Sequence, residues 1–175
     1  MIDTERLIRK AAAYGIDAAP VVRKLDEYAA LLVEYNQKVN LTAITDAEGI
    51  EDRHFIDSLL LAARPEVCGR MVDVGTGAGF PGIVAKLFRP ELDLTLMEPT
   101  GKRVDFLKYA CSALGVEAEF AKERAEEAAR KQWRESFDVA PAPAVGARTA
   151  GAGRVLPALA EAGRRVHCHE RQRRG

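Results

Sequence analysis

VDVGTGAGFPG, residues 72–82, decides the fold of this 175-residue chain. The stretch sets four glycines directly after the strand-like run MVDV: Gly75, Gly77, Gly79 and Gly82. A glycine-rich turn between a strand and a helix lets backbone N–H groups approach a ligand that any Cβ would push away. The stretch therefore predicts the first strand of a Rossmann-like sheet, followed by a loop that cradles a nucleotide-type cofactor.

Short apolar runs alternate with helical segments on the C-terminal side of the loop. The runs with strand character are residues 71–75, 92–99, 116–121 and 137–140, and those with helical character are residues 82–88, 102–115 and the charged stretch up to Trp133. Alternation of this kind predicts right-handed βαβ units. We therefore expect an α/β fold whose parallel sheet carries helices on both faces.

Helical periodicity dominates the residues before the loop. Apolar side chains recur at helical spacing at Val22, Leu25, Ala29, Leu32 and Val33, and a second periodic segment, residues 48–64, ends at Pro65. Asn40 and Thr42 are predicted to stabilise the turn between these two segments. We expect residues 1–66 to form an N-terminal helical extension that folds as a single domain with a cofactor-binding core at residues 67–140.

The loop and its acidic neighbours favour one class of cofactor. Dinucleotide-binding loops follow G-x-G-x-x-G, whereas this one, with Gly75 and Gly77 at its start, follows G-x-G-x-G-x-x-G. The extra glycine and the preceding Asp73 favour a cationic ligand without pyrophosphate, such as S-adenosylmethionine. Glu98, at the tip of the second predicted strand, is the expected partner of the ribose hydroxyls. A nicotinamide-dependent oxidoreductase is the competing interpretation, although the chain lacks a Tyr-x-x-x-Lys pair.

Three motifs together resemble one enzyme family. NLTAI at residues 40–44, HFIDS at residues 54–58 and GTGAGFPG at residues 75–82 look like the small-subunit ribosomal RNA methyltransferase G family, also called glucose-inhibited division protein B. The resemblance runs from about residue 25 to about residue 140. It implies a Rossmann-like methyltransferase that moves a methyl group from S-adenosylmethionine to N7 of one guanosine in the 16S RNA of the small ribosomal subunit, in the cytoplasm. We expect a monomer that binds neither a membrane nor a metal ion.

The resemblance also assigns cofactor contacts. By motif, they fall on Gly75, on Phe80 and on the pair Ala125 and Glu126. The family has an arginine just beyond the fourth strand, but Pro143 takes its place here. N7 of guanine carries a lone pair and no proton, so the implied reaction needs no general base, and no residue is assigned as catalytic.

Other polar residues of the chain could suggest hydrolytic or metal-binding chemistry. His54, Asp57 and Ser58 share one face of a predicted helix, but one helix cannot supply the geometry of a hydrolytic triad and the chain has no G-x-S-x-G motif. We therefore expect a structural or RNA-facing hydrogen-bond cluster. The three cysteines form no C-x-x-C pair, and His167, Cys168 and His169 make a weak metal motif because no second ligand pair accompanies them.

The last residues differ in composition from the rest of the chain. Residues 140–175 hold seven arginines against two glutamates and contain no aromatic residue, isoleucine, lysine or aspartate. Such a segment cannot supply buried strands of a parallel sheet. We interpret residues 141–175 as an aberrant tail produced by a one-base frameshift near Val145 and Gly146, with the C-terminal strands missing. An inactive, truncated fragment of the family is therefore the second alternative.

Overall fold

The computed structural model describes residues 1–124 and 136–141, so the expected tail beyond residue 141 and the charged stretch at residues 125–135 lie outside the described residues. The elements in chain order are α1 (Thr4–Ala12), α2 (Val22–Asn36), α3 (Ala47–Ile50), the π-helical η1 (Glu51–Ile56), α4 (Asp57–Ala62), β1 (Arg70–Val74), α5 (Gly82–Phe88), β2 (Asp93–Met97), α6 (Gly101–Leu114) and β3 (Glu119–Ala121). The expected alternation of strands and helices is confirmed from β1 to β3.

The strands form a parallel sheet in the order β1-β2-β3. Asp73 pairs with Leu96 across β1 and β2. The predicted strand at residues 137–140 appears as a single parallel bridge between Val139 and Met71. Because β2 occupies one edge of β1, Val139 lies along the other edge. The chain therefore changes direction at β1, and in open α/β sheets a ligand crevice lies outside the carboxyl ends of the strands at such a switch point.

The side chains of the sheet alternate between two faces. Asp73 and Leu96 point toward α5, because a Cβ added at Gly82 would touch both of them. Met71 and Leu94, two residues earlier on each strand, share this face and belong to the main hydrophobic core. The opposite face carries Val72, Thr95 and Met97, which are buried as well. Burial on both faces is what the predicted central parallel strands require.

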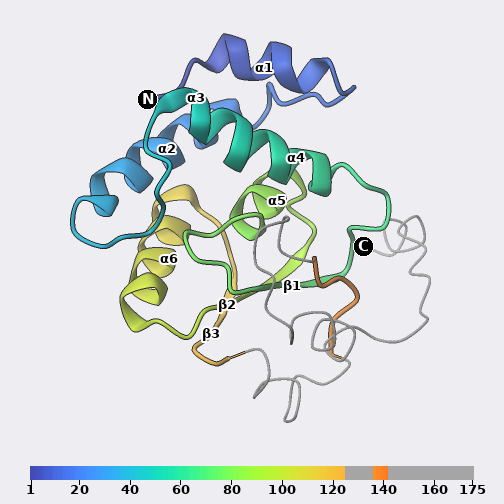
Figure 1. Ribbon diagram of the computed structural model, residues 1–175. Coiled ribbons are helices and arrows are strands. Elements are labelled where there is room, and N and C mark those ends of the chain that lie inside the picture. Colours follow the sequence, from blue (N-terminus) through green and yellow to red (C-terminus); the bar gives the residue numbers. More distant parts are fainter. Residues whose placement is uncertain (125–135, 142–175) are drawn as a thin grey trace.

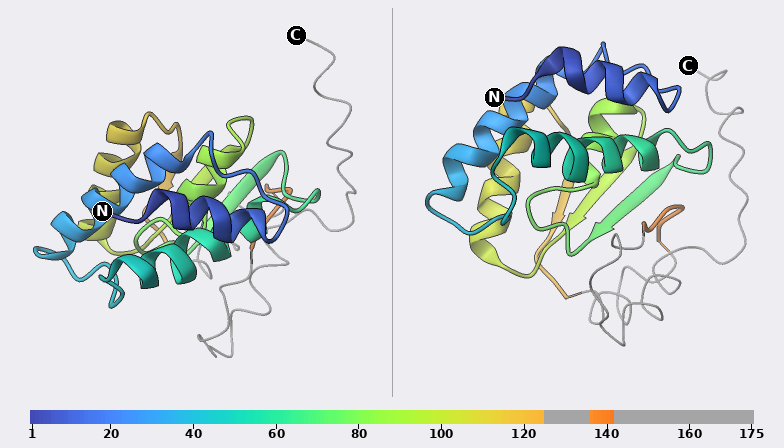
Figure 2. Two further views of the ribbon diagram at one scale, coloured as in Figure 1. Left: turned by 90° about the horizontal axis from the view of Figure 1, so that it is seen from above. Right: turned by 45° about the horizontal axis from the view of Figure 1, so that its top comes forward.

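The N-terminal helices cover the helices that follow the glycine loop. Helix α4 packs on α5, α2 packs on α6, and α1 packs on α2 and η1. Figures 1 and 2 show these helices stacked on one side of the sheet. No helix within residues 1–124 and 136–141 combines the length and apolar character needed to cross a membrane.

An ion pair with a buried carboxylate ties α1 to η1. Glu51 has no exposed surface, and its carboxylate accepts hydrogen bonds from the Arg6 guanidinium at 2.7 and 2.8 Å and from the Asp3 amide at 2.8 Å. Burial alone would raise the pKa of Glu51, but these bonds outweigh it and hold that pKa below its ordinary value. The pair fixes the start of the long helical segment that leads into α4.

Candidate functional site

The glycine loop turns sharply at the carboxyl end of β1. Gly75 has a φ of +66°, a left-handed conformation that favours glycine, and a Cβ added there would meet no atom within 4 Å. Gly82 differs, because a Cβ there would lie 2.6 Å from Leu96 Cδ2 and 2.8 Å from Asp73 Oδ2. Gly75 therefore leaves open space beside the backbone, whereas Gly82 permits close packing of α5 on the sheet.

Asp73 joins the strand, the loop and the helix. Its Oδ2 atom accepts hydrogen bonds from the Thr76 hydroxyl at 2.6 Å and from the Gly82 amide at 2.8 Å. Burial raises the pKa of Asp73 to about 7, although the two hydrogen bonds act in the opposite direction. The side chain therefore positions the loop and carries a carboxyl group that titrates near neutral pH.

Glu98 lies immediately after β2, at the same edge of the sheet. Its carboxylate accepts hydrogen bonds from the Gly77 amide at 3.1 Å and from the Thr100 amide at 3.0 Å. The Arg103 guanidinium is 3.9 Å away. Because the strands are parallel, their carboxyl ends meet at one edge, and an acid 21 residues beyond Gly77 reaches back to the glycine loop.

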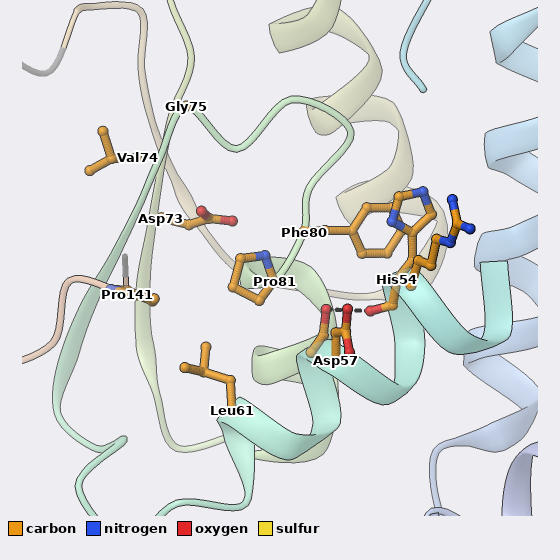
Figure 3. Close-up of a pocket in the computed structure, with 11 residues that line it drawn as sticks. His54, Asp57, Leu61, Asp73, Val74, Gly75, Phe80, Pro81 and Pro141 are labelled. Carbon is orange, nitrogen blue, oxygen red and sulfur yellow. Dashed lines mark hydrogen bonds between the residues drawn. The ribbon is translucent and has the colours of Figure 1, made fainter. Parts of the chain in front are cut away.

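A cavity of about 290 Å³ opens between the carboxyl end of β1 and the η1–α4 segment. Figure 3 shows strand residues and loop residues facing α4 across it. Its lining residues are Arg53, His54, Asp57, Ser58, Leu61, Asp73, Val74, Gly75, Phe80, Pro81 and Pro141. Because Pro141 follows the bridge at Val139, the cavity lies at the switch point of the sheet.

Aromatic rings support the loop beside the cavity. The ring of Phe80 stacks on His54, with centroids 4.3 Å apart and an interplanar angle of 4°, and on the buried Tyr28 at 5.0 Å. The Tyr28 hydroxyl donates a hydrogen bond to the carbonyl of Ala78 in the loop. The His54 ring also lies 3.1 Å from the Thr42 hydroxyl. These contacts hold Phe80 at the cavity wall.

His54, Asp57 and Ser58 do not form a hydrolytic triad. The Ser58 hydroxyl donates to the backbone carbonyl of His54, not to its ring (Figure 3). Burial lowers the pKa of His54 and outweighs the opposing effects of the Arg53 backbone and the Asp57 carboxylate. The expectation that one helix cannot present triad geometry is confirmed for these residues.

The structure brings together part of the predicted site. Asp73, Gly75 and Phe80 line the cavity, whereas Gly77 and Glu98 are joined by a hydrogen bond next to it without lining it. Ala125 and Glu126 lie outside the described residues. The sequence interpretation missed the lining residues Arg53, Leu61 and Pro141. A signal for two of them was present, because Arg53, Asp57 and Leu61 recur every four residues along one helical segment.

Asparagine side chains differ in their contribution to the turn after α2. The turn after α2 is stabilised by Asn36, whose side chain bonds to the backbone of Leu41 and Thr42, and not by the side chain of Asn40. The prediction for Thr42 is confirmed, because its hydroxyl accepts a hydrogen bond from the Ile44 amide at 3.0 Å. The motif at residues 167–169 lies outside the described residues. Within residues 1–124 and 136–141, no three His, Cys, Asp or Glu side chains gather in a way that could hold a metal ion.

Comparisons with known proteins point to one family. The sequence model described as "rRNA small subunit methyltransferase G" matches residues 21–172. Relatives named ribosomal RNA small subunit methyltransferase G include one from Moorella thermoacetica, 43% identical over 149 residues, which cover 80% of this chain and 61% of the relative. The relative from Staphylococcus epidermidis is 36% identical over 163 residues, covering 91% of this chain and 68% of the relative. The chain spans about three fifths of the length of the first of these relatives.

Proposed function

This chain belongs to the rRNA small subunit methyltransferase G family, and we propose that it transfers a methyl group from S-adenosylmethionine to N7 of a guanosine in 16S rRNA of the small ribosomal subunit. The observation that carries the proposal is the cavity at the switch point, where an open glycine backbone, a buried carboxyl group and an aromatic side chain meet. The partner RNA would place the protein in the cytoplasm, and we expect it to act there as a monomer.

The residues present fit this cofactor. The free space beside Gly75 admits a ligand against the backbone, as a side chain at that position would not. Glu98 would accept hydrogen bonds from the ribose hydroxyls. The backbone of Gly77 would contact the cofactor between Gly75 and Glu98. Asp73 and Phe80 would face the cationic end of the cofactor. Ala125 and Glu126 remain proposed contacts from the resemblance. When bound, S-adenosylmethionine supplies an electrophilic methyl group on a sulfonium.

The chain's own residues would act by positioning and by exclusion of water. N7 of guanine attacks through a lone pair and loses no proton, so no side chain has to act as a general base. Leu61, Phe80 and Pro81 give the cavity an apolar wall that limits water access. Stacking against His54 keeps the Phe80 ring in place, and Asp73 holds the loop on α5. The geometry therefore suits a methyl transfer that depends on orientation.

Calorimetric titration with S-adenosylhomocysteine, combined with transfer of labelled methyl groups from S-adenosylmethionine to unmodified small ribosomal subunits, tests the proposal. We expect both binding and transfer by the full chain, with weaker binding in Glu98→Gln and unchanged binding in the exposed matched variant Glu91→Gln. Binding of NADH in place of S-adenosylhomocysteine would support an oxidoreductase. Cofactor binding without transfer would identify an inactive fragment of the family.

A further inference from the structure

Some of the polar side chains that line the cavity already form hydrogen bonds or ring contacts within the protein. Asp73 bonds to Thr76 and Gly82, and the Ser58 hydroxyl bonds to the carbonyl of His54. The His54 ring contacts the Thr42 hydroxyl and stacks on Phe80. These polar groups therefore already have partners within the protein.

Two charged side chains that line the cavity form no such contacts within the described residues. Arg53 and Asp57 lie four residues apart on the η1–α4 segment, and both are exposed. Within residues 1–124 and 136–141, neither side chain forms a hydrogen bond or an ion pair. Figure 3 shows Asp57 on α4, across the cavity from the strand that carries Asp73. The cavity therefore has one wall near the glycine loop and a second wall with a free carboxylate.

We propose that Asp57 is the residue that selects guanine, by accepting hydrogen bonds from N1–H and the N2 amino group on the Watson–Crick edge of the target base. This inference rests on the proposed function. Transfer to N7 requires that the opposite edge of the base faces the methyl donor, which leaves the Watson–Crick edge for recognition by the second wall. Bases that are modified outside a helix are read in this way by hydrogen bonds to that edge.

Asp57 and Arg53 differ in the hydrogen-bonding groups that they offer to a base. An ionised carboxylate offers only acceptors and can take two parallel N–H bonds, which matches the adjacent donors of guanine. Arg53 offers only donors and cannot pair with those groups. Adenine presents an unprotonated N1 in place of the N1–H of guanine, so its lone pair would face the Asp57 carboxylate. Asp57 therefore favours guanine and disfavours adenine at the same position.

Equilibrium binding of guanosine 5′-monophosphate and inosine 5′-monophosphate to the full chain, followed by NMR titration, tests the inference without methyl transfer. Inosine lacks the N2 amino group and would lose one of the two bonds to Asp57. We expect the wild-type chain to bind the guanosine nucleotide about tenfold more tightly than the inosine nucleotide, since a hydrogen bond to a charged group contributes that much. Asp57→Ala should bring this ratio close to one.

The control is Asp105→Ala, which removes another exposed helical aspartate, on α6, that does not line the cavity. It should keep the wild-type ratio, and thermal unfolding should show that both variants are folded. A wild-type chain without preference for guanosine, or an Asp57→Ala variant that retains it, would overturn the inference. Cofactor binding and methyl transfer are measured separately from nucleotide binding. Failure of the inference can therefore be distinguished from failure of the proposed function.

Discussion

Replacement of Gly82 by alanine tests how the glycine loop is packed on the sheet. The added Cβ would lie 2.6 Å from Leu96 Cδ2, 2.8 Å from Asp73 Oδ2 and 3.0 Å from Asp73 Cβ. Leu96 and Asp73 are 1% and 3% exposed, so neither side chain can move into solvent to make room. The substitution must therefore shift α5 away from the sheet and strain the hydrogen bond from the Gly82 amide to Asp73.

The expected loss of stability follows from these contacts. Overpacking of a buried position costs about 2 kcal/mol, and weakening of the amide bond to Asp73 adds about 1 kcal/mol. The reduced conformational freedom of the unfolded chain offsets this cost by about 1 kcal/mol. The net decrease in the free energy of unfolding is then about 2 kcal/mol, which corresponds to a fall in Tm of roughly 4–8 °C for a chain of this size.

Urea and thermal denaturation followed by circular dichroism measure this decrease. Gly75→Ala is the matched control, because its φ of +66° is unfavourable for alanine by about 1 kcal/mol while its Cβ would meet no atom. We expect Gly75→Ala to weaken the free energy of S-adenosylhomocysteine binding by more than it lowers the free energy of unfolding. The reasoning would be refuted if Gly82→Ala were as stable as the wild-type chain, or if Gly75→Ala were the less stable of the two.

Three further predictions address buried polar groups. Tyr28→Phe leaves the Ala78 carbonyl without its hydrogen-bond donor and should lower the free energy of unfolding by about 1–3 kcal/mol in urea denaturation. Because burial holds the pKa of Asp73 at about 7, the calorimetric affinity for S-adenosylmethionine should rise roughly tenfold from pH 6 to pH 8, whereas Asp73→Asn should show no such rise. Bonds from Arg6 keep the pKa of Glu51 below its ordinary value, so stability should decrease as the pH falls below about 4.3, and Glu51→Gln should flatten this part of the stability–pH curve.

Elements with a local signal could be predicted closely. The apolar periodicity that begins at Val22 corresponds to α2, and the glycine loop follows β1 as expected. The position of Glu98 next to Gly77 could also be inferred, because a right-handed βαβ unit brings the ends of successive parallel strands to one edge. The turn after α2 could not be predicted as closely, since residue type suggests a turn without showing that Asn36, and not Asn40, closes it.

The sequence by itself determined the order of strands and helices and the place of the cofactor loop, because periodicity and glycine spacing act between residues close in the chain. Only the tertiary structure decided which side chains share the cavity. Arg53 on η1 and Asp57 on α4 line the same cavity as Asp73 because α4 packs on η1 and on α5, and Pro141 joins them because Val139 pairs with β1. Such contacts depend on how distant segments pack against one another, which no local pattern encodes.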